Sequence, residues 1–288
     1  MLSVEQLIQV PGSESLEANR LVQFVPILQS ILVECLATER KVSTKSHDFD
    51  LVSSSDVKIG QMWRDALPTL FPRATFVCEE MPETHSLLTE NTKLAICDPI
   101  DGTFNFLKGG KQYGSMISIW DGDCPVETIV FQPGTLRILY AFQEETYIWE
   151  HIPNTVRQIF PRDWSQTQGE RGVIISHRDY LENPYLKGLI SVERAWDPQS
   201  MVELGFTMAL DDSRGFHFQT VGKVWDWAPY VHLLINLGFI VVNSETFQPW
   251  SLFDTSLGAI SFLEGDDSLL ENIKRAHRLQ DVMNATRL

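Results

Sequence analysis

The chain has 288 residues, of which 43% are apolar, and a formal net charge of −15. This length allows a large core in one domain or in two packed lobes. The absence of a run of 18 apolar residues predicts that no helix spans a membrane, and the first residues lack the basic and apolar segments of a secretory signal. The negative charge argues against nucleic acid as a partner, because its phosphate backbone would be repelled.

The four cysteines are widely spaced and form no CxxC pair: Cys35, Cys78, Cys97 and Cys124. This spacing supports neither a metal cluster nor a disulfide framework. We therefore expect reduced thiols and a cytoplasmic location.

The N-terminal region is predicted to be helical. Apolar residues at three- and four-residue spacing indicate an amphipathic helix over residues 14–40, with a kink or a break at Pro26. A polar loop that contains Lys45 follows, and a second helix is predicted over residues 57–70.

Acidic residues lie at the ends of two elements in this region. Ser54 or Ser55 is the expected N-cap of the second helix, and Asp56 falls in its first turn, where the helix dipole favours a carboxylate. Residues 74–77 form a predicted strand that is followed by Glu79. Taken alone, an acid at a strand end usually faces solvent.

The stretch at residues 98–106, Asp-Pro-Ile-Asp-Gly-Thr-Phe-Asn-Phe, carries the strongest chemical signal. It follows an apolar run at residues 94–97 of buried-strand type, and Pro99 is expected to take the chain out of the sheet. Gly102 permits a tight turn, and backbone N–H groups near Thr103 could face an anion.

Asp98 and Asp101 lie three residues apart in this stretch. One interpretation is that they only cap a turn. The other is that they bind hard cations, which together with the exposed amides would bind phosphate. The second interpretation predicts metal-dependent phosphate chemistry.

Four strand-like segments follow and predict an antiparallel meander: residues 113–120, 126–131, 137–142 and 146–150. The polar and irregular stretch from residue 151 to residue 169 is expected to separate two lobes. We place an N-terminal α+β lobe at residues 1–150 and a C-terminal α/β lobe at residues 151–288.

The C-terminal region is predicted to alternate strands and helices. We expect strands at residues 173–176, 215–219, 239–242 and 257–262, and helices at 204–210, from 224 onward and at 268–278. Asp226 is the expected N-cap of the helix that this segment opens, with Pro229 in its first turn. His177 has no partner at ligand spacing, which indicates a surface or core role.

The stretch at 98–106 resembles the signature of the inositol monophosphatase family, which belongs to the lithium-sensitive, magnesium-dependent phosphatases. Three flanking segments are similar to further motifs of this family: residues 45–56, 78–80 and 225–230. The resemblance covers residues from about 14 to about 265. It implies an α/β layered sandwich of the αβαβα type, with metals between two lobes, and a homodimer.

The resemblance also implies a set of metal ligands. These are Glu79, Asp98, the Ile100 carbonyl, Asp101, Asp226 and, for an additional weaker metal, Asp56. Two or three Mg²⁺ ions would be bound.

Further roles follow from the same resemblance. Catalytic roles fall to Glu79 and Thr103, which would activate a water, and to Asp101. The backbone N–H groups of Gly102 and Thr103 would bind the phosphate. Lys45 would lie near the site entrance, and Gln219 stands where sugar-phosphate relatives carry a glutamate that contacts substrate hydroxyls.

The implied function is Mg²⁺-dependent hydrolysis of a small polyol or sugar phosphate by direct water attack, with inhibition by Li⁺. The alternatives are a phosphatase for 3′-phosphoadenosine 5′-phosphate, histidinol phosphate or fructose bisphosphate, and a catalytically degenerate binding protein. The chain departs from the family pattern at Cys78, which replaces a glycine, at Gln219, and at Pro229-Tyr230, where Tyr230 is expected to narrow the substrate pocket.

Overall fold

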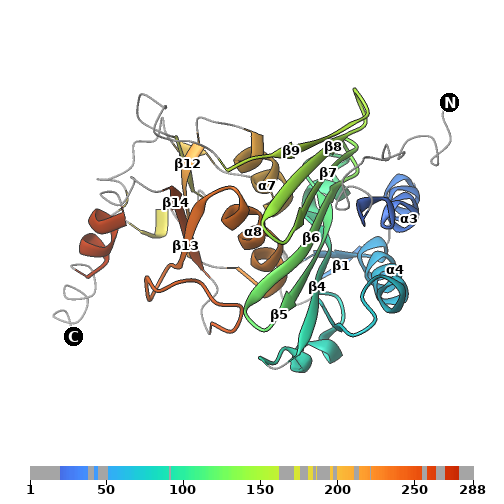
Figure 1. Ribbon diagram of the computed structural model, residues 1–288, viewed down its shortest axis with the longest axis horizontal. Coiled ribbons are helices and arrows are strands. Elements are labelled where there is room, and N and C mark those ends of the chain that lie inside the picture. The colour runs from blue at the N-terminus through green and yellow to red at the C-terminus, as the bar shows by residue number, and fades with distance from the viewer. Residues whose placement is uncertain are drawn as a thin grey trace.

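The computed structural model describes residues 20–37, 42–44, 51–90, 92–161, 172–175, 181–183, 186, 195–196, 200–210, 214–220, 222–254, 258–263 and 270–278. Its helices and sheets form five successive layers of the α/β sandwich (Figure 1). The expected αβαβα architecture is therefore confirmed. Within the described ranges, no helix is long and apolar enough to cross a membrane.

The large sheet has seven strands in the order β3-β4-β5-β6-β7-β8-β9. Their bounds are β3 Thr75–Cys78, β4 Lys93–Asp101, β5 Gly114–Asp121, β6 Cys124–Gln132, β7 Arg137–Phe142, β8 Glu145–Glu150 and β9 Thr155–Ile159. Only the pair β3–β4 is parallel among these neighbours. The predicted meander is confirmed as β5 to β8.

Strand β9 was not predicted, because it is short, buries only its last residue and lies in a polar stretch. It pairs antiparallel with β8. The large sheet therefore extends to Ile159, past the lobe boundary that we placed at residue 150. The division into lobes remains a proposal.

The small sheet has five strands in the order β11-β10-β12-β14-β13. Their bounds are β10 Gly172–Ile175, β11 Ala195–Trp196, β12 Arg214–Gln219, β13 Phe239–Asn243 and β14 Ala259–Leu263. Four of them match predicted strands to within two residues. A separate two-stranded sheet, β1 (Val42–Thr44) with β2 (Leu51–Ser53), was not predicted. Lys45 and His177 lie outside the described residues.

Helices α3 (Val25–Leu36) and α4 (Ser54–Leu70) cover the outer face of the large sheet (Figure 1). The predicted interruption near Pro26 is confirmed, since a turn precedes α3 and Pro26 lies in its first turn. The N-cap of α4 is Ser53, so the prediction of Ser54 or Ser55 was wrong. Strand β2 ends at Ser53 in extended conformation, as an N-cap requires.

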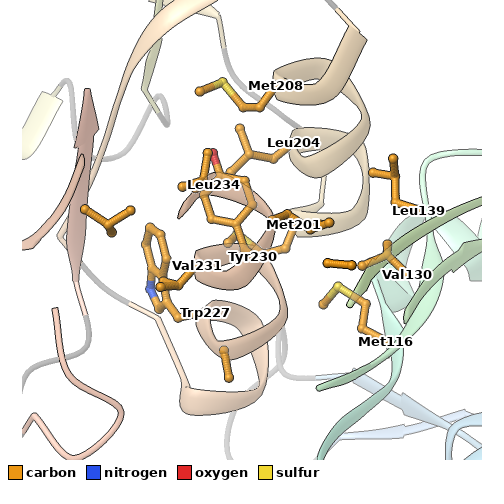
Figure 2. Packing of buried hydrophobic residues seen from close by; sticks show 14 of the residues in the cluster. Met116, Val130, Leu139, Met201, Leu204, Met208, Trp227, Tyr230, Val231 and Leu234 are labelled. Carbon is orange, nitrogen blue, oxygen red and sulfur yellow. The ribbon is translucent and has the colours of Figure 1, made fainter. Parts of the chain in front are cut away.

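Helices α7 (Met201–Leu210) and α8 (Val224–Asn236) form the layer between the two sheets (Figure 1). Buried side chains of α7 and α8, among them Met201 and Leu234, belong to one hydrophobic cluster with Met116 and Leu139 of the large sheet (Figure 2). Full burial of a side chain such as Leu234 contributes about 1.5–3 kcal/mol. The described helix at residues 270–278 forms the outermost layer, where Leu270 packs on the far face of the small sheet.

Candidate active site

Asp98 and Asp101 lie on either side of a bulge near the end of β4. Asp98 is opposite Met116 of β5 and Asp101 is opposite Gly114, so β4 carries one extra residue between them. Pro99 falls within this bulge, where its missing N–H costs no ladder hydrogen bond. The expectation that the chain leaves the sheet at Pro99 was therefore wrong, because β4 continues to Asp101.

Gly102 forms the tight turn that leads from β4 into α5 (Thr103–Leu107). Its φ is +78°, and an added Cβ would lie 2.8 Å from the Gln112 carbonyl oxygen and 3.0 Å from Cβ of Ser200. A larger residue would be strained there and would also collide. The predicted turn is confirmed, and it places Thr103 at the first position of α5.

Thr103 connects the turn to the start of α4. Its Oγ1 lies 2.9 Å from the Ile100 carbonyl oxygen and 3.1 Å from Oδ1 of Asp56. Oδ2 of Asp56 accepts the Ser53 N–H at 2.8 Å, which closes a capping box. Burial raises the pKa of Asp56, and its hydrogen bonds with Ser53 and Thr103 oppose that change.

Asp101 receives the N-terminus of α7. Its Oδ2 accepts the Val202 N–H at 2.6 Å, and Met201 N–H and the Ser200 side chain also hydrogen-bond to this carboxylate. Burial raises the pKa of Asp101 to about 6, although these hydrogen bonds favour the charged form. The contact holds the middle helical layer against the end of β4.

Asp226 is the third residue of α8, and the N-cap is Lys223, so the N-cap prediction for Asp226 was wrong. Its Oδ2 accepts the Lys223 N–H at 2.7 Å. Burial raises the pKa of Asp226 to about 8, and the negative charges of Glu79 and Asp101 raise it further. Pro229 lies inside α8, beyond the first turn in which it was expected.

Asp98 lies at the centre of the acidic group. It is 2% exposed, and its Oδ1 has no hydrogen-bond partner among the described residues. Burial raises the pKa of Asp98 well above its usual value, and four neighbouring carboxylates raise it further. In decreasing order of effect these are Glu79, Asp101, Asp226 and Asp56. The structure thus gathers all five predicted acidic ligands into one electrostatic cluster, which we call the acid cluster.

The donor set of the acid cluster fits a hard divalent cation. Like charges about 4 Å apart repel by about 4 kcal/mol at an effective dielectric constant near 20, and Mg²⁺ or Ca²⁺ binds carboxylate oxygens. Three of the acids, Asp56, Asp101 and Asp226, direct one oxygen at a backbone N–H instead. Accordingly, in the part of the chain that the structure describes, no three acid, cysteine or histidine side chains are already arranged to enclose an ion. The unpartnered Asp98 oxygen is the position at which an ion would meet the cluster.

Three departures from the family pattern have structural explanations. Cys78 is not among the described residues with positive φ, so its backbone does not require glycine. The Sγ of Cys78 lies close to Gly60, where an added Cβ would be 3.2 Å from the sulfur. Tyr230 is 1% exposed and packs on Trp227, so it belongs to the core and does not narrow a pocket as expected. Gln219 ends β12 and hydrogen-bonds the buried ring of His217.

The sequence did not reveal two sets of contacts around the acid cluster. The N-terminus of α7 binds Asp101 across 101 positions of the chain, and its first turn, which already contains Glu203, carries no signal for a further acidic partner. The second set involves His85, whose Nε2 lies 2.9 Å from the Cys78 carbonyl oxygen, next to Glu79. A single histidine in a short turn carries no sequence signal for such a role.

Comparison with known proteins places the chain in a family. The sequence profile described as "Inositol monophosphatase family" matches residues 17–259. Inositol monophosphatase 1 of Sus scrofa is 37% identical over 81 residues, which cover 27% of this chain and 29% of that protein. The 3′(2′),5′-bisphosphate nucleotidase CysQ of Escherichia coli is 26% identical over 112 residues, which cover 39% of this chain and 45% of that protein.

Each of these alignments spans less than half of the relative's length, whereas similarity to solved structures extends over most of the chain. A staphylococcal IMPase-I in complex with products superposes with a TM-score of 0.71 at 19% identity, covering 90% of this chain and 96% of that one. The two proteins therefore share a fold. Because the family profile also covers most of its length, the chain belongs to the inositol monophosphatase family.

Proposed function

We propose that this protein is a Mg²⁺-dependent phosphomonoesterase that hydrolyses a small polyol or sugar phosphate. The observation that carries the proposal is the buried, unpartnered Asp98 oxygen among four other carboxylates. A cluster of this kind destabilises the metal-free fold, so its presence indicates a cationic ligand. With a net charge of −15, the protein would also need bound cations to attract an anionic phosphate ester.

The metal ligands in this proposal come from the ends of β3 and β4 and from the first turns of α4 and α8. Glu79, Asp98 and the Ile100 carbonyl would hold one ion, Asp98, Asp101 and Asp226 a second, and Asp56 an optional third. When bound, such ions lower the pKa of a water and neutralise charge on the leaving oxygen.

Residues of the chain would position the other reactants. The Thr103 hydroxyl, which is held between Ile100 and Asp56, is available to orient the attacking water, and the Glu79 carboxylate would accept its proton. The N–H groups of Gly102 and Thr103 at the start of α5 would bind phosphate oxygens. Water then attacks phosphorus directly, and no side chain becomes phosphorylated.

The relatives support the choice of substrate candidates. Inositol monophosphatase 1 makes inositol phosphates the first candidates, and CysQ makes 3′-phosphoadenosine 5′-phosphate the second. The amide of Gln219, which both donates and accepts hydrogen bonds, would alter the choice of alcohol. A cytoplasmic homodimer that is inhibited by Li⁺ completes the proposal.

Phosphate release from a panel of esters with Mg²⁺ tests this function. The panel contains inositol 1-phosphate, 3′-phosphoadenosine 5′-phosphate, fructose 1,6-bisphosphate, histidinol phosphate and glycerol 2-phosphate, with Asp101→Asn as the control. We expect turnover of a polyol or sugar phosphate that is lost in Asp101→Asn and inhibited by tens of millimolar Li⁺. If Mg²⁺ binds but no ester is hydrolysed, the protein is a degenerate binding protein instead.

A further inference from the structure

His85 touches the segment that carries Glu79. It lies in the 3₁₀ helix η1 (Pro82–Leu87), and its Nε2 is 2.9 Å from the Cys78 carbonyl oxygen. Because a carbonyl oxygen only accepts, Nε2 carries the proton of this hydrogen bond. The Cys78 N–H in turn donates to Oγ1 of Thr84 at 3.0 Å. Helix η1 therefore holds the end of β3 through both backbone groups of the residue before Glu79.

The same imidazole ring lies against the helix that carries Asp226. The His85 and Trp225 rings are tilted by 34° with centroids 4.7 Å apart. Trp225 immediately precedes Asp226 in the first turn of α8. Trp225 and Leu88, just after η1, also pack against the same hydrophobic cluster. One half-buried side chain thus contacts two segments that contribute acids to the acid cluster.

The first turn of α8 depends on such contacts because of Pro229. Proline has no N–H, so Trp225 lacks the backbone hydrogen bond that residue 229 would donate to its carbonyl. The turn with Asp226 is therefore tied to the rest of α8 by fewer backbone bonds. Ring contact with His85 supplies a connection to β3 in its place.

We propose that His85 is a positioning residue: it couples the Glu79 segment to the first turn of α8 and thereby sets the spacing of the acids that bind metal. The inference rests on the proposed metal site. Mg²⁺ demands nearly ideal octahedral geometry, so a small change in this spacing weakens binding. Loss of a residue that orients metal ligands typically costs about 10- to 100-fold in metal affinity.

Three substitutions separate the two contacts. His85→Phe keeps a ring against Trp225 and removes the hydrogen bond to Cys78, His85→Gln keeps a donor and removes the ring, and His85→Ala removes both. The matched control is His151→Phe, because the His151 ring lies beside Trp149 at a centroid distance of 6.2 Å, in the turn after β8.

Calorimetric titration of the full chain with Mg²⁺ alone is the primary measurement, with melting temperature recorded for each variant. We expect the Kd for Mg²⁺ to rise about tenfold or more in His85→Ala, by less in His85→Phe and His85→Gln, and not in His151→Phe. Trp225→Leu should add little to His85→Ala, since both remove the same coupling. A lower melting temperature with unchanged Mg²⁺ affinity, or independent effects of the two substitutions, overturns the inference.

The outcomes also separate this inference from the proposed function. If wild-type protein hydrolyses no ester but its Mg²⁺ affinity still falls in His85→Ala, the phosphatase proposal fails and the role of His85 stands. If wild-type protein turns over an ester and His85→Ala retains the wild-type Mg²⁺ dependence, the phosphatase proposal stands and the role of His85 is overturned. Absence of Mg²⁺ binding by wild-type protein overturns both.

Discussion

Helix α8 contributes one residue to each of two buried polar groups, a cluster of acids and a neutral hydrogen-bond chain. Near its N-terminus, Asp226 belongs to the acid cluster, in which burial and mutual repulsion raise the pKa of each of Asp98, Asp101 and Asp226. Further along, the fully buried His232 belongs to a neutral hydrogen-bond chain in which donors and acceptors match.

The order of protons along this histidine chain can be assigned. Nε2 of His232 donates to the Gln143 carbonyl at 2.9 Å, so its Nδ1 accepts from Oγ1 of Thr128, also at 2.9 Å. Thr128 then accepts from Oγ of Ser118 at 2.6 Å, and Ser118 accepts from Nε1 of Trp120 at 2.8 Å. Burial lowers the pKa of His232 to about 4, which keeps the ring neutral at physiological pH.

The difference separates polar groups that stabilise the fold from groups that await a ligand. A buried hydrogen-bond chain with matched donors and acceptors carries only a small free-energy cost of burial, and it fixes the position of α8 on the large sheet. Buried like charges with an unpartnered oxygen carry a free-energy cost, which is relieved by protonation or by a bound cation. Four predictions test this contrast.

Neutralising the centre of the acid cluster should have the largest effect. Asp98→Asn should reduce phosphate release on the order of 10³-fold, because the bridging ligand is lost, yet raise the unfolding free energy of the metal-free protein by about 1–3 kcal/mol. Phosphate assays and urea unfolding in EDTA measure the two effects.

Glu127→Gln is the matched control for that variant. Glu127 is also a buried acid, but it pairs with Arg20 at 3.0 Å and accepts from the Tyr140 hydroxyl at 2.8 Å. Its neutralisation should lower stability by about 1–3 kcal/mol and leave turnover unchanged. Equal stability changes of the same sign in both variants would contradict the contrast.

Breaking the histidine chain should have the next largest effect. His232→Leu leaves the Thr128 hydroxyl without its acceptor and removes one donor to the Gln143 carbonyl, and we expect a loss of about 1–3 kcal/mol in urea unfolding. Asn236 still donates to that carbonyl at 2.9 Å, which limits the loss. A variant as stable as the parent would show that the chain contributes no net stability.

The pH dependence of the metal-free protein should reveal the acids. The pKa of folded Asp226, about 8, lies above its ordinary value of 3.8, so the native state binds more protons and stability falls as pH rises toward 8. The pKa values of the buried His217 and His232 are lowered from 6.5, so their stability contribution changes with pH below 6.5 and does not oppose the decline above it. Urea unfolding between pH 6.5 and 8 should show a decline of up to about 1.4 kcal/mol per pH unit per group.

Two comparisons check the origin of that decline. Asp226→Asn should flatten it, and saturating Mg²⁺ should abolish it by stabilising the charged carboxylates. Stability that increases with pH over this range would refute the assignment of raised pKa values.

The second buried histidine should give the smallest effect. His217 is 1% exposed, burial lowers its pKa to about 3, and its Nδ1 has no partner among the residues that the structure describes. His217→Leu should therefore change the unfolding free energy by less than about 1 kcal/mol, because it removes an unsatisfied atom along with the hydrogen bond to Gln219. A loss as large as that of His232→Leu would remove the distinction between the two rings.

The local sequence pattern was sufficient to predict much of the secondary structure of this protein. The meander of β5 to β8 follows from turn residues between apolar runs, and the Gly102 turn follows from a glycine between an acid and a hydroxyl. Asp98 and Asp101 could be named because their motif is contiguous, and the other three acids because flanking segments resemble further motifs of the family. Boundaries were less predictable: Asp226 was expected as the N-cap of α8 but is its third residue, and β4 continues through a bulge at Pro99.

Tertiary structure alone decided how these residues act together. Thr103 meets Asp56 across 47 positions, and the α7 N-terminus meets Asp101 across 101. His85 reaches Trp225, and Asp98 is left with a buried oxygen that no described residue binds. These relations arise because α8 is packed between two sheets, which brings strand ends and helix starts from distant segments into one place. Periodicity reports which side of an element is buried, but it carries no information about which distant element covers that side.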